Sequence, residues 1–174
     1  EGIQMKRAFS LFTVICFIFL FSSCKKEVNM EYITEYQRNN FSAEIIIEQG
    51  KEKYSAEIEN SGGTLYLRFT EPSGLSPFVF KRSDGTLSLS VHGTEIPFTE
   101  NSLKFISVLP VVDIFSVPVS GIWKISEENI SGVELYVCRN DGVCLYIDKN
   151  SRLPIKALND STTVNIISFK RISE

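Results

Sequence analysis

Residues 41–70 read FSAEIIIEQGKEKYSAEIENSGGTLYLRFT and set the pattern that most of the chain follows. Apolar and polar side chains alternate along three runs of this stretch, at residues 41–48, 54–59 and 65–70. Gly50 separates the first two runs, and Gly62 with Gly63 separates the second from the third. Alternation of period two with short glycine-containing breaks is typical of antiparallel strands joined by tight turns. The stretch therefore predicts a β-meander with one apolar face.

Further strands are predicted after this meander, again at short and fairly regular spacing. They are expected at residues 78–80, 87–91, 133–138, 143–148, 153–158 and 163–170. A sheet with one apolar and one polar face is covered on one side only. The fold class is therefore mainly β with short helices (α+β), and we expect a curved antiparallel sheet that forms an incomplete β-barrel with a helical lid over residues 41–174.

Two segments depart from the strand pattern. Residues 28–39 place apolar side chains at helical spacing behind Asn29, which can cap a helix, so a short helix should follow the tether within residues 24–40. Residues 101–116 are almost wholly apolar and contain Pro110, which kinks or ends a helix. We expect a broken helix or two short helices here as the lid, with Leu103, Phe105, Ile106, Leu109 and Phe115 as its apolar residues.

An uncharged run from Ala8 to Ser23 follows Lys6 and Arg7 and stands directly before Cys24. A basic start, an apolar middle and small residues at the end describe a secretory signal. A helix over the apolar part, residues 9–21, would rise roughly 20 Å, short of the ~30 Å hydrocarbon core. Residues 1–23 are thus expected to be a signal peptide that is removed, with ordinary secretion or an uncleaved anchor as alternatives.

The end of that run, Phe21-Ser22-Ser23-Cys24, resembles a bacterial lipobox. The resemblance implies lipidation of Cys24 as the new first residue and anchoring by two or three acyl chains, such as palmitate. Two or more chains hold a protein on a membrane stably, whereas one chain binds only marginally. The expected location is the cell envelope, on the extracytoplasmic side of a bacterial membrane, and the outer membrane if the organism has one.

Composition argues against several classes of function. The whole chain has 18 Lys and Arg against 21 Asp and Glu, a formal net charge of −3, with no clustered basic face of the kind that binds nucleic acid. His92 is the single histidine and stands in a turn-like stretch, and no nucleophile elbow, phosphate loop or dinucleotide fingerprint is present. We expect no enzyme activity, cofactor or metal site.

Cys138 and Cys144 flank a predicted hairpin whose loop has two readings. A two-residue loop at Asp141-Gly142 would oppose Cys138 to Leu145, whereas a three-residue loop with Gly142 left-handed would oppose Cys138 to Cys144. The second reading keeps the apolar face consistent and predicts a cross-strand disulfide, because extracytoplasmic cysteine pairs usually oxidise. Two reduced thiols are the alternative.

Aromatic side chains are abundant, and they fit either an ordinary core or the wall of an apolar cavity inside a half-barrel. In the cavity reading, the curved sheet and the lid enclose a space for apolar ligands. The residues expected to line it are Phe41, Ile45, Leu67, Phe69, Phe78, Phe80 and Leu89.

The order of these elements, together with Phe41–Glu44, Gly63–Pro72 and Asp148–Lys156, resembles the lipoprotein localisation factor superfamily (LolA/LolB-like). The resemblance implies a cavity that accepts acyl chains of lipids or lipoproteins, in a carrier or an acceptor. It also implies an arginine near the third strand that latches the lid, for which Arg68 is the nearest candidate. Tethering through Cys24 favours an anchored acceptor over a soluble shuttle.

Two functions remain open from the sequence. The first is a membrane-anchored binder of lipid or lipoprotein acyl chains. The alternative is an anchored, non-catalytic interaction scaffold, acting as a homodimer or with another protein partner, such as in sporulation or germination.

Overall fold

A computed structural model describes residues 28–83, 86–98, 113–115, 122–159 and 161–172. Short helices are α2 (Met30–Ile33) and the 3₁₀ turns η1 (Glu35–Arg38), η2 (Ser73–Leu75) and η4 (Asp113–Phe115). The strands are β1 (Phe41–Gln49), β2 (Glu52–Ser61), β3 (Thr64–Glu71), β4 (Phe78–Ser83), β5 (Thr86–Val91), β6 (Thr94–Pro97), β7 (Lys124–Ile130), β8 (Val133–Asn140), β9 (Val143–Asp148), β10 (Pro154–Leu158) and β11 (Thr162–Arg171).

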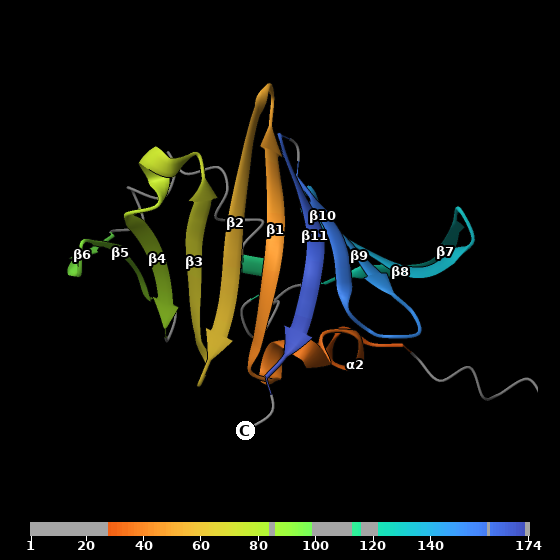
Figure 1. Ribbon diagram of the computed structural model, residues 1–174. Helices are drawn as coiled ribbons and strands as arrows, with labels where there is room; N and C mark the ends of the chain where they lie inside the picture. Colours follow the sequence, from red (N-terminus) through yellow and green to blue (C-terminus); the bar gives the residue numbers. More distant parts are fainter. Residues whose placement is uncertain (1–27, 84–85, 99–112, 116–121, 160, 173–174) are drawn as a thin grey trace, which may run out of the picture.

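The described strands form one antiparallel sheet in the order β6-β5-β4-β3-β2-β1-β11-β10-β9-β8-β7 (Figure 1). Each half is a meander, β1 to β6 on one side and β7 to β11 on the other, and the two halves meet where β1 pairs with β11. No pairing joins β6 to β7 among the described residues, so the sheet is open. The predicted strands and the incomplete barrel are therefore confirmed.

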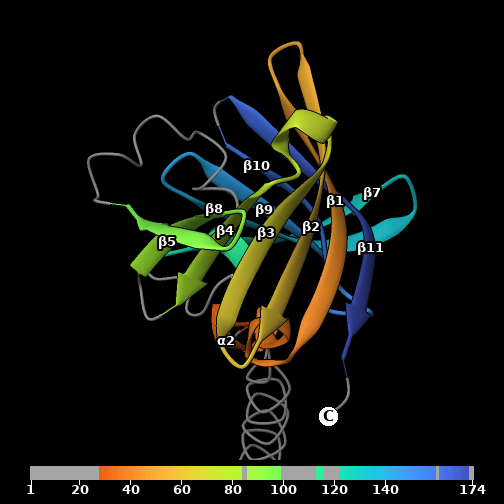
Figure 2. The same cartoon turned by 60° about the vertical axis from the view of Figure 1, so that its left-hand side comes forward.

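The sheet curves around a single core (Figure 2). Buried side chains of β1, β2 and β3 belong to the same cluster as those of β8, β9, β10 and β11, although they lie in opposite halves of the sheet. Fully burying one Ile, Leu or Phe side chain contributes about 1.5–3 kcal/mol. We call the face that carries this cluster the concave face and the opposite face the convex face.

The predicted N-terminal helix is split in two. The Asn29 side chain accepts a hydrogen bond from Tyr32 N at 2.9 Å, which confirms the cap, but α2 ends at Ile33 and the chain continues as η1. The buried Asn60 side chain of β2 donates at 3.0 Å to the carbonyls of Gln37 and Asn39. These bonds satisfy carbonyl groups that a short helix leaves without partners, and they fix η1 against the sheet.

The cysteine register predicted from the three-residue loop is wrong. Asp141 and Gly142 form a two-residue turn with φ of 40° and 79°, and Cys138 lies opposite Leu145. A turn with two positive φ values matches the twist of the flanking strands, and glycine adopts the second value without strain. Cys138 therefore faces the core, Cys144 lies on the convex face, and both thiols are free, so the predicted disulfide is not formed.

The expected helical lid is not confirmed. Its residues Leu103, Phe105, Ile106 and Leu109 lie outside the described part of the chain. The described part of the segment is η4, a single 3₁₀ turn. No helix within the described residues is both long and apolar enough to cross a membrane.

Candidate functional site on the concave face

A row of apolar side chains crosses the concave face from the centre of the sheet to its β6 edge. The strand register places Ala43, Ile58, Leu67, Phe80, Leu89 and Ile96 opposite one another in turn, on β1 to β6. Because side chains alternate between faces along each strand, their cross-strand neighbours share one face. The sequence alternation thus produces a continuous apolar surface.

Burial along this surface falls toward the β6 edge, and the predicted cavity residues divide accordingly. Phe41, Ile45, Leu67 and Phe69 on β1 and β3 are buried in the core. Phe78, Phe80 and Leu89 on β4 and β5 are only half-buried. Ile96 on β6 is 49% exposed. The structure therefore places the first four in a filled core and the last three where apolar surface is still accessible.

The core side of the surface is filled by η4. Ile114 and Phe115 are buried, and the Phe115 ring lies 6.3 Å from that of Phe41. The Tyr36 hydroxyl and the Gln37 amide both donate to the carbonyl of Ile114, at 3.0 and 2.5 Å. Burial raises the pKa of Tyr36 well above its ordinary value, so this hydroxyl stays a donor at neutral pH. Phe115, predicted as a lid residue, is thus fixed inside the curved sheet.

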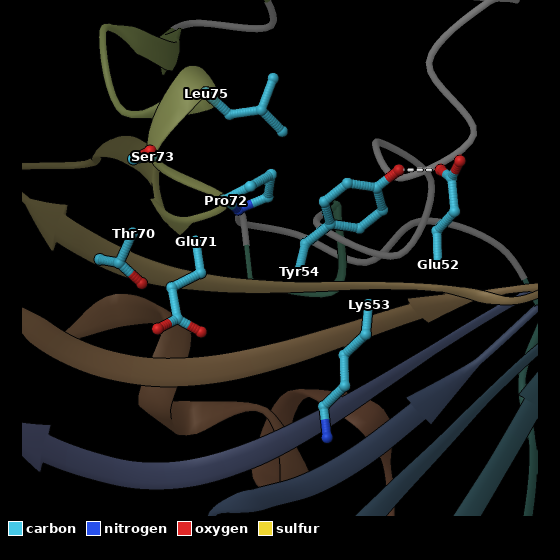
Figure 3. A pocket seen from close by; sticks show the side chains of 8 residues that line it. All are labelled: Glu52, Lys53, Tyr54, Thr70, Glu71, Pro72, Ser73 and Leu75. Atoms are coloured by element: carbon cyan, nitrogen blue, oxygen red, sulfur yellow. Dashed lines mark hydrogen bonds between the residues drawn. The ribbon is translucent and has the colours of Figure 1, made fainter.

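A cleft of about 940 Å³ opens at the end of β2 and β3, beside η2 (Figure 3). The side chains of Tyr54, Pro72 and Leu75 lie on one side of the sheet and face a common space, whereas those of Lys53 and Glu71 point to the other side. The Tyr54 hydroxyl donates to the Glu52 carboxylate at the rim. The remaining lining residues are Thr70 and Ser73. The cleft is thus apolar on its concave side and acidic at one end.

Ring contacts connect the cleft to the half-buried surface. Tyr54 meets Phe69 at 5.9 Å, Phe69 meets Phe80 at 6.1 Å, and Phe80 stacks on Phe98 at 6.2 Å. Offset and edge-to-face pairs at these distances stabilise one another beyond simple burial. We call Tyr54, Phe69, Phe80 and Phe98 the aromatic row. It extends from the cleft across β3 and β4 to the residue that follows β6.

Arg68, the candidate latch, is on the wrong face for that role. Its guanidinium pairs with Glu59 at 3.0 Å and lies 5.6 Å from the centre of the Tyr66 ring, on the exposed convex face. The strand alternation explains this position, because Leu67 and Phe69 on either side face the core. An exposed ion pair of this kind contributes little to stability.

The described residues contain few other side chains of the kinds used in catalysis or metal binding. His92 occupies the exposed turn between β5 and β6, as its sequence context predicts. The described part of the chain contains no group of three or more His, Cys, Asp or Glu side chains arranged to hold a metal ion.

Sequence reasoning missed the cleft. The alternation that Tyr54 shares with Ala56 and Ile58 assigns it to the apolar face but gives no sign of a cleft. Pro72 and Leu75 carried no such signal, because their stretch reads only as a break between strands. Ile114 was likewise not singled out, since nothing in the sequence marks its carbonyl as an acceptor.

No protein-family model and no curated protein matches the sequence. Solved structures with a similar fold include an uncharacterized conserved protein from Thermus thermophilus, with a TM-score of 0.55 and 12% identity over 82% of this chain and 85% of that one. A LolA superfamily protein from Nitrosomonas europaea has a TM-score of 0.49 and 13% identity, over 84% and 95%. The MucA/MucB complex of Pseudomonas aeruginosa has a TM-score of 0.46 and 16% identity, over 81% and 55%. At 12% identity, the similarity to the Thermus thermophilus structure is one of fold alone, and the LolA/LolB-like resemblance of the sequence stays a prediction.

Proposed function

We propose that this chain is a lipid-anchored, non-catalytic protein of the bacterial envelope that binds acyl chains of lipids or lipoproteins on its concave face. The observation that supports this most directly is the gradient of burial along that face. Apolar surface is covered at β1 and β3 but remains accessible at Phe78, Phe80 and Leu89, and Ile96 is 49% exposed. Contiguous accessible apolar surface in a globular domain marks interaction sites.

The energetics favour an extended apolar ligand over a small polar one. Each methylene group that leaves water contributes about 0.8 kcal/mol, and a surface of several apolar side chains can cover many methylenes. Half-buried rings such as Phe80 and Phe98 offer flat contacts along one direction of the sheet. An acyl chain fits this surface better than a compact ligand.

Binding of a fluorescent long-chain fatty acid to the purified protein tests the proposal. Leu89→Asp places a charge in the apolar surface, which should lower affinity about tenfold because the carboxylate must lose water beside the ligand. Ser88→Asp is the matched control, since the neighbouring residue of β5 faces the convex side. We expect Ser88→Asp to bind within about twofold of the parent protein.

Two results would contradict the proposal. One is an absence of saturable fatty-acid binding by the folded parent protein. The other is equal loss of binding in both variants, because an effect independent of the face cannot come from the concave surface.

Lipidation of Cys24 is part of the proposal and has its own test. Cells that make the chain should incorporate labelled palmitate into it and retain it in the membrane fraction. Cys24→Ala should abolish the label and release the protein. A variant that keeps the label would exclude Cys24 as the acylated residue.

The alternative, an anchored interaction scaffold, is supported by the exposed edge of β7. Among the described strands, β7 pairs only with β8, and the exposed Ile130 and Val133 stand at the turn between them. Unpaired strand edges can add a strand from a second chain. Light scattering on the ligand-free protein would favour this function if it gave a stable dimer.

A further inference from the structure

We propose that the cleft beside η2 binds a positively charged head group, so that the preferred ligand is a cationic amphiphile whose chain extends along the aromatic row. This inference rests on the proposed function for the chain and adds a class of head group to it. Three observations carry it: the side chains on the concave side of the cleft, the charges around it, and its continuity with the aromatic row.

The concave side of the cleft combines a ring with a carboxylate. Figure 3 shows Tyr54, Pro72 and Leu75 around one space, with the Tyr54 hydroxyl directed at Glu52. This hydrogen bond holds the carboxylate close to the ring, and it raises the pKa of Tyr54, so the hydroxyl remains a donor at neutral pH. A ring face beside a carboxylate attracts an ammonium group through both the ring quadrupole and the negative charge.

The charges that line the cleft favour a cation over an anion. The Glu52 carboxylate lies on the concave side, whereas Glu71 and the single basic residue of the lining, Lys53, both point to the other face of the sheet. The Lys53 Nζ atom lies 4.0 Å from Glu48. Glu71 accepts a hydrogen bond from Ser55 at 3.3 Å. No salt bridge between described residues involves Glu52. An anionic head on the concave side would meet the Glu52 carboxylate, and like charges disfavour such a contact.

The cleft has room for a head group and leads to apolar surface. Its volume of about 940 Å³ exceeds that of a trimethylammonium group several times over and lies within the usual range of ligand sites. Tyr54 and Leu75 both pack against the core cluster. From Tyr54, the ring contacts to Phe69, Phe80 and Phe98 lead toward β6. A chain attached to a head group at Glu52 would therefore continue over rings.

Calorimetric titration with two single-chain amphiphiles tests the inference. Dodecyltrimethylammonium and dodecanoate carry chains of similar length and opposite charge, and both are used below the concentration at which they form micelles. We expect the cationic probe to bind the parent protein about five- to tenfold more tightly. Glu52→Gln should remove about three- to fivefold of that affinity and leave dodecanoate unchanged or slightly improved.

Matched variants separate a local effect from a general one. Glu57→Gln makes the same chemical change on the convex face of the same strand, beside Arg68, and should leave the preference unchanged. Tyr54→Phe keeps the ring and should retain most of the binding, whereas Tyr54→Leu should lose it together with the preference.

Each outcome decides between the two proposals. A cationic preference that Glu52→Gln removes and Glu57→Gln does not remove supports the inference. Equal binding of both probes, or equal effects of the two glutamate variants, overturns the inference and leaves acyl-chain binding intact. Binding of neither probe by the folded protein overturns both.

Discussion

At the scale of single residues, Cys138 shows how one buried thiol makes stability depend on pH. Burial raises the pKa of Cys138 from its ordinary 9.0 to about 12. The unfolded chain releases this proton above about pH 9, whereas the folded chain keeps it. The stability that the protonated Cys138 thiol contributes is therefore fully present below about pH 9. It is lost progressively as the pH rises toward about 12.

We expect denaturant unfolding at about pH 7, 9 and 10.5 to show a progressive loss of stability at alkaline pH. Cys138→Ala should be less stable at neutral pH, because it leaves a small cavity, but its stability should fall less steeply with pH. Cys144→Ala, on the convex face, reports the effect of removing a thiol outside the core. The buried hydroxyl of Tyr36 also has a raised pKa, so a shallower slope remains. Parallel curves for the parent and Cys138→Ala would contradict this account.

The same two cysteines show what residue patterns could not decide. Consistency of the apolar face favours the three-residue loop, yet Leu135, Tyr136, Val137 and Cys138 are all buried, so the alternation does not distinguish the two registers. The two-residue turn prevailed because Asp141 and Gly142 adopt positive φ values that fit the strand twist. The predicted disulfide depends on the three-residue register and on the usual oxidation of extracytoplasmic cysteines, whereas the observed register places the two thiols on opposite faces.

At the scale of elements, η4 is attached to the N-terminal turn η1 through a single carbonyl. Ile114 accepts from both Tyr36 and Gln37. Tyr36→Phe should cost about 1 kcal/mol of unfolding free energy, since one donor to this carbonyl remains. Gln37→Leu should cost a similar amount.

The double variant should cost more than the sum of the two single variants, because it leaves a buried carbonyl without a donor from these residues. Thermal unfolding of the four proteins gives the coupling free energy directly. Purely additive costs would show that the two bonds act independently and that Ile114 finds another partner. Asn60, which donates to Gln37 and Asn39 carbonyls, should not be changed in the same cycle, since it supports η1 separately.

Elements with a regular spacing of apolar residues could be predicted from the sequence, and elements without it could not. Strands such as β1 and β2 repeat apolar residues at every second position, and the structure confirms them. The stretch from Val28 to Asn39 has helical spacing, yet contacts from the distant Asn60 and Ile114 hold it as two short turns. Strand β6 ends in Pro97 and has only four residues, and a strand of that length is too short to show a periodic pattern in the sequence. The cleft was missed for the same reason, since Pro72 and Leu75 belong to no periodic run.

At the scale of the whole molecule, the pairing of β1 with β11 determines how the chain closes on itself. The first and last strands lie side by side at the middle of the sheet, so neither meander can complete its core alone (Figure 1). Strands β6 and β7, which are central in the sequence, become the edges. The open end near β6 is where apolar surface stays accessible, and this links the topology to the proposed binding surface.

This arrangement predicts a gradient of amide hydrogen exchange across the sheet. Strand β1 pairs with β11 on one side and with β2 on the other along its whole length, so its amides should exchange only through global unfolding. Amides of β6, whose four residues are all exposed, should exchange through local opening at a much lower free energy. Mass spectrometry of exchange at increasing denaturant measures both free energies.

Saturating fatty acid should raise protection in β4 to β6 and leave β1 unchanged, because the ligand binds where the surface is still accessible. Protection of ligand-free β6 equal to that of β1 would mean that this edge is already covered, and the concave face would then have no accessible strip for an acyl chain.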